Sequence, residues 1–183
     1  MTPPPPPFDL AIGRGTLRQL HASLVNHAPD QAIAILQEAG YAAGEAIYQA
    51  FGKWLADRTA GGVDSPGNLD SELLTEMLSE FFNSGGWGTV TLTPIGTNAL
   101  AIDSADWAEA EPGSAQAPMC SFSAGMLADF LGRISDDTVA VLEVECRSKG
   151  DGRCRFLSAP PDVLDKVYNE MTAGRTYAEA LGA

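Results

Sequence analysis

The sequence is poor in basic residues, cysteine and histidine, and it has no long apolar run. Eleven Lys and Arg residues stand against 24 Asp and Glu among 183 residues, which gives a formal net charge of −13. A surface of this charge repels nucleic-acid phosphates, so we expect no nucleic-acid partner. No apolar run approaches the roughly 18 residues that span a bilayer, and the N-terminus lacks the basic and apolar regions of a secretion signal. We therefore expect no membrane span and a cytoplasmic location.

Two motifs of common enzyme classes are also missing from the sequence. It contains neither the G-x-G-x-x-G fingerprint of dinucleotide-binding proteins nor the G-x-S-x-G of serine hydrolases. The two histidines, His21 and His27, lie far in sequence from the cysteines. We expect each to be a surface or capping residue rather than a catalyst. These absences favour a binding protein over an enzyme that works alone.

The composition predicts one folded domain behind a short tail. Five consecutive prolines, Pro3 to Pro7, favour an extended polyproline II arm that donates no backbone hydrogen bonds. Residues 1–7 are therefore predicted to be a proline-rich tail. Residues 8–183 are predicted to be a single domain, because a chain of this length corresponds to about one domain.

Apolar residues recur at helical spacing in the N-terminal half. A first helix is predicted to follow Gly15, with Thr16 as its N-cap, and to end near His27. A second helix is predicted after Asp30, and a third between the N-cap Asp70 and the glycines at 85–86. The second helix has the longest apolar stripe: Ile33, Leu36, Gly40, Gly44, Ile47, Phe51 and Leu55.

Two glycines, Gly40 and Gly44, lie within this stripe. Each costs roughly 1 kcal/mol relative to alanine in a helix, so we expect another backbone to pack closely against them. The neighbour is either another element of the same chain or a second copy of the chain. The second alternative would make the protein a dimeric scaffold.

The hydrophobic period changes after residue 86, from helical spacing to alternation. Helices that precede strands with one inserted helix indicate an α+β fold, in which a helical N-terminal half packs on a mostly antiparallel sheet. The predicted elements are strands at 87–93 and 99–102 joined by a turn at 94–98, a loop at 111–118, a helix directly after Cys120, a hairpin of strands 138–146 and 155–158, and a final helix from Pro160-Pro161 to Gly174.

The three cysteines, Cys120, Cys146 and Cys154, form the most informative pattern. An odd number of cysteines in a reducing compartment favours metal or thiol chemistry over a disulfide framework. Cys146 and Cys154 flank the turn of the predicted hairpin, so hairpin formation would bring them close together. The sequence therefore predicts a metal site that joins the hairpin to the start of a helix. The alternative is that the cysteines are small buried apolar residues.

A fourth ligand could come from Glu143 or Glu145. Strict alternation along a strand places both carboxylates on the face opposite Cys146, so either one needs a bulge near the strand end to reach the same ion. Four basic residues surround the cysteines of the hairpin: Arg147, Lys149, Arg153 and Arg155. Beside a metal site they would lower the pKa values of the thiols and offset the negative charge of the site. The alternative is that they form a solvated hairpin tip.

Residues 119–157 resemble a known family. The segments MCSFSAGMLADFLG and VLEVECRSKGDGRCRF are similar to the 4-vinyl-reductase-type domain, also called the hydrocarbon-binding domain. The resemblance implies a fold shared with the TRAPP vesicle-tethering subunits, which often dimerise, and so a homodimer. It also implies a structural zinc ion bound by three cysteines and one glutamate, which here would be Cys120, Glu143, Cys146 and Cys154.

Relatives that sense phenolic compounds for bacterial transcription regulators have an apolar pocket beside the metal. The stretch around Trp107 is similar to the part of the family that lines this pocket, so Trp107 is a pocket candidate by resemblance. Three apolar residues after Cys120 are further candidates from their common helical face, with ordinary core packing as the alternative: Phe122, Met126 and Phe130.

The expected function is therefore that of a zinc-stabilised domain that binds a hydrophobic or aromatic small molecule. No ATPase or DNA-binding segment is found in the sequence, so we expect the domain to act alone or through a partner protein. One alternative is an accessory protein or reductase in the reduction of a (bacterio)chlorophyll vinyl group, as the resemblance also suggests. The other alternative is a dimeric scaffold without a ligand.

Overall fold

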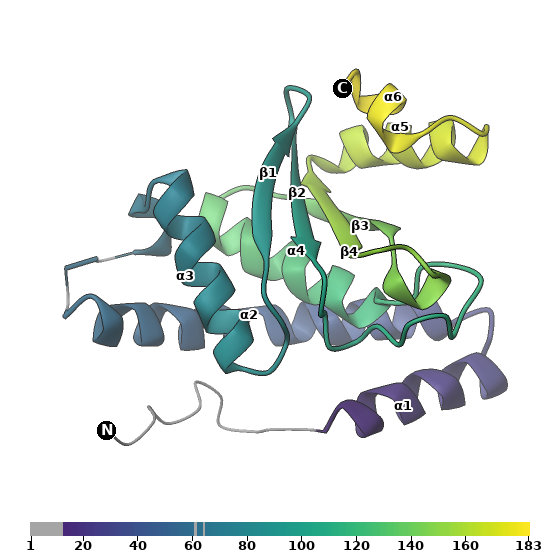
Figure 1. The fold of residues 1–183 in the computed structure, drawn as a ribbon, viewed down its shortest axis with the longest axis horizontal. Helices are drawn as coiled ribbons and strands as arrows, with labels where there is room; N and C mark the ends of the chain where they lie inside the picture. Colours follow the sequence, from purple (N-terminus) through teal and green to yellow (C-terminus); the bar gives the residue numbers. More distant parts are fainter. Residues whose placement is uncertain (1–12, 61, 64) are drawn as a thin grey trace.

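The computed structural model describes residues 13–60, 62–63 and 65–183, so the predicted tail at 1–7 lies outside the described residues. Up to α5 the helices and strands follow one another as the sequence predicts, with a helical half first (Figure 1). The helices are α1 (Arg14–His27), α2 (Ala32–Arg58), α3 (Ser71–Ser84), α4 (Ser121–Ser135), α5 (Pro161–Thr172) and α6 (Tyr177–Leu181), with short 3₁₀ helices η1 (Pro66–Asn68) and η2 (Arg147–Lys149). The strands are β1 (Thr91–Ile95), β2 (Ala99–Ser104), β3 (Ala140–Glu145) and β4 (Cys154–Ala159).

The four strands form one antiparallel sheet in the order β1-β2-β4-β3. Side chains alternate between its two faces. Ile102 and Phe156 belong to a large core shared with α2, α3 and α4. Ala101 and Leu157 face the other way and pack with residues of α5 and α6 in a smaller cluster. The α+β fold with helices on a mostly antiparallel sheet is therefore confirmed.

The longest helix, α2, packs along α4, and Figure 1 shows the two helices running side by side. A Cβ atom at Gly40 would overlap the backbone carbonyl of Phe122 in α4. In return, a Cβ atom at Gly125 of α4 would overlap the backbone carbonyl of Gln37 in α2. Two backbones can approach this closely only where neither has a side chain. The partner of the small-residue face at Gly40 is thus an element of the same chain, not a second copy.

Several predicted boundaries differ from the structure because local signals compete there. The first helix begins at Arg14 with Gly13 as its N-cap, not at Thr16, and Gln31 rather than Asp30 caps α2. Ile33, predicted to lie on the buried stripe, is 61% exposed, and its neighbour Ala32 is buried instead. Asp70 does cap α3, since its side chain accepts a hydrogen bond of 2.8 Å from the Leu73 amide.

The strands and the C-terminus show two further differences. The predicted strand at 87–93 begins only at residue 91 and continues to residue 95, because the chain around the glycines before it forms turns. The short helix α6 was not predicted; a capping box between Thr176 and Glu179 starts it.

The helix contact at Gly125 leads to a stability prediction. We expect Gly125→Ala to lower the free energy of unfolding by about 3 kcal/mol, because the added methyl group meets a backbone atom that cannot move away. Gly52→Ala in α2 is the matched control: its methyl group meets no atom, so it should be neutral or stabilise the protein by up to about 1 kcal/mol. Urea unfolding measures both values, and equal stability of the two variants would contradict the close helix contact.

Candidate functional site

Four buried side chains from three elements meet beside the sheet. Cys120 immediately precedes α4, Glu143 lies in β3, Cys146 follows β3, and Cys154 is the first residue of β4. One donor atom from each residue lies within 4.8 Å of the donor atoms of all the others. The structure therefore brings together the four residues that the sequence and the resemblance singled out, and this cluster could hold a metal ion.

The sulfur atoms are spaced like the ligands of one tetrahedral ion. The Sγ atom of Cys120 lies 3.9 Å from those of both Cys146 and Cys154. All three cysteines are free, so no disulfide joins them. Two sulfurs bonded to one tetrahedral zinc at about 2.3 Å would lie roughly 3.8 Å apart. The distances between the sulfur atoms therefore fit one shared metal ion without movement of the backbone.

A bulge in β3 decides between the two glutamates. The register between β3 and β4 shifts between Glu143 and Glu145, which pair with the consecutive residues Phe156 and Arg155. One extra residue in the strand sends the two carboxylates to opposite faces of the sheet. Glu143 faces the cysteines, and Glu145 faces away from them. The bulge that the sequence required for a carboxylate ligand is therefore present, and it selects Glu143.

The cluster buries four ionisable side chains close to one another. Glu143 Oε2 accepts a hydrogen bond of 2.9 Å from the Cys120 amide, whereas its Oε1 is buried and has no hydrogen-bond partner. Burial, together with the charge of the Cys146 thiolate, raises the pKa of Glu143 to about 8. Hydrogen bonds from the neighbouring thiols lower the pKa of Cys146. The raised pKa of Glu143 shows that a second negative charge beside the thiolate is unfavourable in this buried cluster, and a bound cation would remove that penalty.

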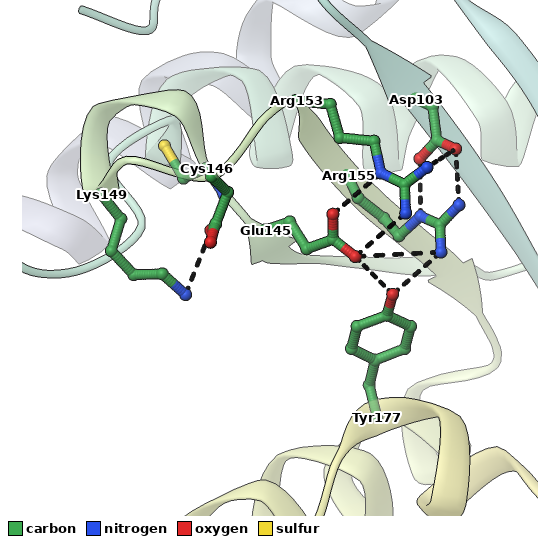
Figure 2. A network of polar contacts seen from close by, with 8 residues as sticks. Asp103, Glu145, Cys146, Lys149, Arg153, Arg155 and Tyr177 are labelled. Carbon is green, nitrogen blue, oxygen red and sulfur yellow. Dashed lines mark hydrogen bonds and ion pairs between the residues drawn. The ribbon is translucent and has the colours of Figure 1, made fainter. Parts of the chain in front are cut away.

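Three of the four basic residues around the hairpin are paired with carboxylates outside the cluster, as Figure 2 shows. Arg155 forms a bidentate pair with Asp103, with two contacts of 2.6 Å. Arg153 holds Glu145 at 2.8 and 3.1 Å. Lys149 lies 3.1 Å from Asp151. The prediction that these residues offset the charge of the thiols is therefore wrong for these three.

The same network fixes the outward position of Glu145. Its carboxylate is held by Arg153 and by the hydroxyl of Tyr177, which donates a hydrogen bond to Glu145 from α6 (Figure 2). A carboxylate held on this face cannot turn towards the cysteines. The network thus supports the bulge that leaves Glu143 on the side of the cysteines.

The four pocket candidates lie in or against the aromatic core. Trp107 is 1% exposed, its ring lies 5.6 Å from that of Phe82, and its indole N–H donates a 2.8 Å hydrogen bond to the Ser123 hydroxyl. Met126 and Phe130 are fully buried, and Phe122 stacks on the ring of Trp87. The role of these residues in ligand binding stays a prediction.

A pocket of about 290 Å³ opens elsewhere, between α1 and the loop that leads from β2 to α4. We call it the α1 pocket. Its walls include Leu17 and His21 of α1, Glu109 and Met119 of the loop, and Ser148 of η2. None of the four predicted pocket residues lines it. Burial lowers the pKa of His21, which lines this pocket and is therefore not a simple surface histidine.

Glu109 is a buried residue that the sequence did not single out. Its carboxylate accepts hydrogen bonds from the amides of Phe122 at 3.1 Å and Ser123 at 2.8 Å, and from the Ser123 hydroxyl. It therefore caps the first turn of α4, where the N-cap Cys120 offers no side-chain bond. The local sequence does not indicate this role. A capping glutamate that can be recognised in a sequence lies three residues after the N-cap of its own helix, whereas Glu109 lies in the loop before α4.

Comparison with known proteins supports the fold and the family resemblance. Residues 105–160 match the family model of the 4-vinyl-reductase domain, and this segment contains all four residues of the cluster. The match confirms the resemblance that the cysteine pattern predicts. No curated protein matches the chain. Among the helices of the described residues, none is long and apolar enough to cross a membrane.

Two solved structures are similar to the chain. The crystal structure of the phenol-responsive sensory domain of the transcription activator PoxR with phenol superimposes with a TM-score of 0.63 at 21% identity, over 82% of this chain and 76% of that one. This likeness shows a common fold. A vinyl-4-reductase family protein from Methanocaldococcus jannaschii is 24% identical, with a TM-score of 0.41 over 61% of this chain and 77% of that one.

Proposed function

We propose that the chain is a zinc-stabilised domain that binds a hydrophobic or aromatic small molecule and acts alone or through a partner protein. The proposal of a metal ion rests on one observation: three thiols and one carboxylate lie together in a buried cluster. The unpartnered Oε1 of Glu143 supports it further, because a buried carboxylate oxygen without a donor is costly unless a cation binds it.

Zinc suits this donor set better than other common ions. Thiolates select soft or borderline metals, whereas calcium and magnesium take oxygen ligands. Three sulfurs and one carboxylate oxygen complete a tetrahedron and leave no position for a reacting water, which is typical of a structural site. Bound zinc would supply folding free energy here, and the four residues would join the start of α4 to the β3–β4 hairpin.

We predict that Cys146→Ser lowers zinc content and stability together. The loss of one thiolate should weaken zinc binding at least a hundredfold, which corresponds to about 2.8 kcal/mol. Elemental analysis of the purified protein and thermal unfolding measure the two effects. A full complement of zinc with an unchanged melting temperature in this variant would refute the assignment.

The two glutamates of β3 provide a matched pair of controls. Glu143→Gln removes the carboxylate that faces the cysteines and should reduce zinc affinity. Glu145→Gln makes the same chemical change on the other face, where the residue contacts Arg153 and Tyr177. It should keep the full zinc content and lose no more than about 1 kcal/mol of stability. Equal zinc loss in both variants would show that the bulge does not select the ligand.

The small-molecule part of the proposal is supported by the family match and the fold. The PoxR domain of similar fold is described as phenol-responsive, and its crystal structure was determined with phenol. In this chain aromatic side chains fill the space between the sheet and the helices, and the indole N–H of Trp107 donates its hydrogen bond to Ser123 among them.

We predict that phenol or toluene stabilises the zinc-loaded protein. A ligand present at a hundred times its dissociation constant adds about 2.7 kcal/mol to the free energy of unfolding. A thermal-shift series with phenol, toluene and a porphyrin measures the effect for the three classes of apolar ligand. No shift with any of them would count against a hydrophobic ligand.

We further propose that the protein forms a homodimer through exposed apolar residues of α2. Two large apolar side chains of this helix, Ile33 and Tyr41, are 61% and 55% exposed. Sedimentation at micromolar concentration should give the mass of a dimer, and Ile33→Asp should give that of a monomer. A monomeric parent protein under these conditions would contradict the dimer.

A further inference from the structure

The α1 pocket has two walls, and one of them is held on the core of the domain by more contacts than the other. One wall is the loop before α4 together with Ser148, which pack on the core next to the cysteine cluster. The other wall is α1, which is held by the buried Leu17 and by two polar contacts of its arginines. Arg18 pairs with Glu111 at 2.7 Å, and Arg14 donates a 3.0 Å hydrogen bond to the Gly86 carbonyl.

Glu109 is the buried charged residue in the lining of the pocket. This residue is only 8% exposed, and its hydrogen-bond partners are the amides and the hydroxyl at the start of α4. Among the residues that the structure describes, no Lys, Arg or His forms an ion pair with it, and Arg18 is paired with Glu111 instead. Its Oε1 accepts one bond, of 3.1 Å from the Phe122 amide, so it can accept a second.

The charges that line the pocket leave a negative excess. Arg18 and Glu111 form an ion pair at the rim, and burial lowers the pKa of His21, which disfavours its charged form. Burial raises the pKa of Glu109 to about 7, which is the response of a carboxylate that lacks a counter-charge. Leu17, Val25 and Met119 add apolar surface to the lining, beside uncharged polar side chains such as that of Ser148. The pocket therefore combines one carboxylate that has no ion-pair partner with a small space that is apolar on part of its walls.

We propose that the α1 pocket binds a small organic ammonium ion, a primary amine on a short apolar or aromatic body. Its N–H group donates a hydrogen bond to Glu109, and its body packs between α1 and Met119. Anions are repelled by Glu109, and a neutral alcohol gains the hydrogen bond without the charge pairing. This inference rests on the proposed small-molecule function, and it places the ligand under α1 rather than among the core aromatics.

Three probes of one shape test the ligand class: 2-phenylethylamine, 2-phenylethanol and phenylacetate. Calorimetric titration into the zinc-loaded full chain about one pH unit above the pKa of Glu109, where this carboxylate is mostly ionised, gives their affinities. We expect the amine to bind at least tenfold more tightly than the alcohol, and phenylacetate not to bind. Equal affinity for the amine and the alcohol, or tighter binding of the acid, would overturn the proposal.

Variants in α1 test the location without touching the cap of α4. Ala22 lines the pocket, so Ala22→Trp should weaken amine binding at least tenfold by filling it. Gln19→Trp places the same side chain at an exposed position of α1 outside the lining, and it should leave the affinity unchanged. Glu109→Gln lies in the loop and does change the cap of α4, and it should abolish the preference for the amine over the alcohol.

The same variants separate this inference from the proposed function. If phenol stabilises the parent protein and Ala22→Trp alike while the amine does not bind, the small-molecule function stands and the α1 pocket is not its site. Amine binding that is equal in Ala22→Trp and Gln19→Trp would likewise overturn the location.

Discussion

The start of α4 and the β3–β4 hairpin meet at the buried cluster, and the rest of the site depends on that junction. Cys120 lies 26 residues before Cys146 in the sequence, yet their sulfurs are 3.9 Å apart. The junction places α4 against the inner face of the sheet, and the reciprocal glycine contact then fixes α2 on α4. The loop that carries Glu109 has to end at this same point. The cysteine cluster, the helix packing and the wall of the α1 pocket are therefore parts of one arrangement.

Three glutamates near this junction meet the cost of burial in three different ways. Glu145 is held by an arginine and a tyrosine, and Glu109 by the amides of a helix start. Glu143 has one bonded oxygen and one without a partner, and a cation bound among the thiols would satisfy the second oxygen. The environment, not the residue type, sets the role of each carboxylate.

Sequence patterns predicted the α+β order, the hairpin and the meeting of the cysteines, because helical spacing, alternation and turn residues are local signals. They could not choose between Glu143 and Glu145 without the family resemblance, since a bulge is a property of the pairing with β4. The burial of Glu109 and the pocket at His21 also escaped prediction. Both arise from tertiary contacts, of α1 with the loop and of Glu109 with the start of α4, that no local pattern in the sequence indicates.

The position of α1 has a consequence for how such a domain could diversify. This helix lies outside the segment that matches the 4-vinyl-reductase domain, and it touches the cysteine-bearing part mainly as one side of a pocket. Substitutions along its inner side can therefore reshape the space above Glu109 while the packing around the cysteines keeps the fold intact. A stable framework covered by a separate helix would allow new chemical preferences to evolve with little loss of stability.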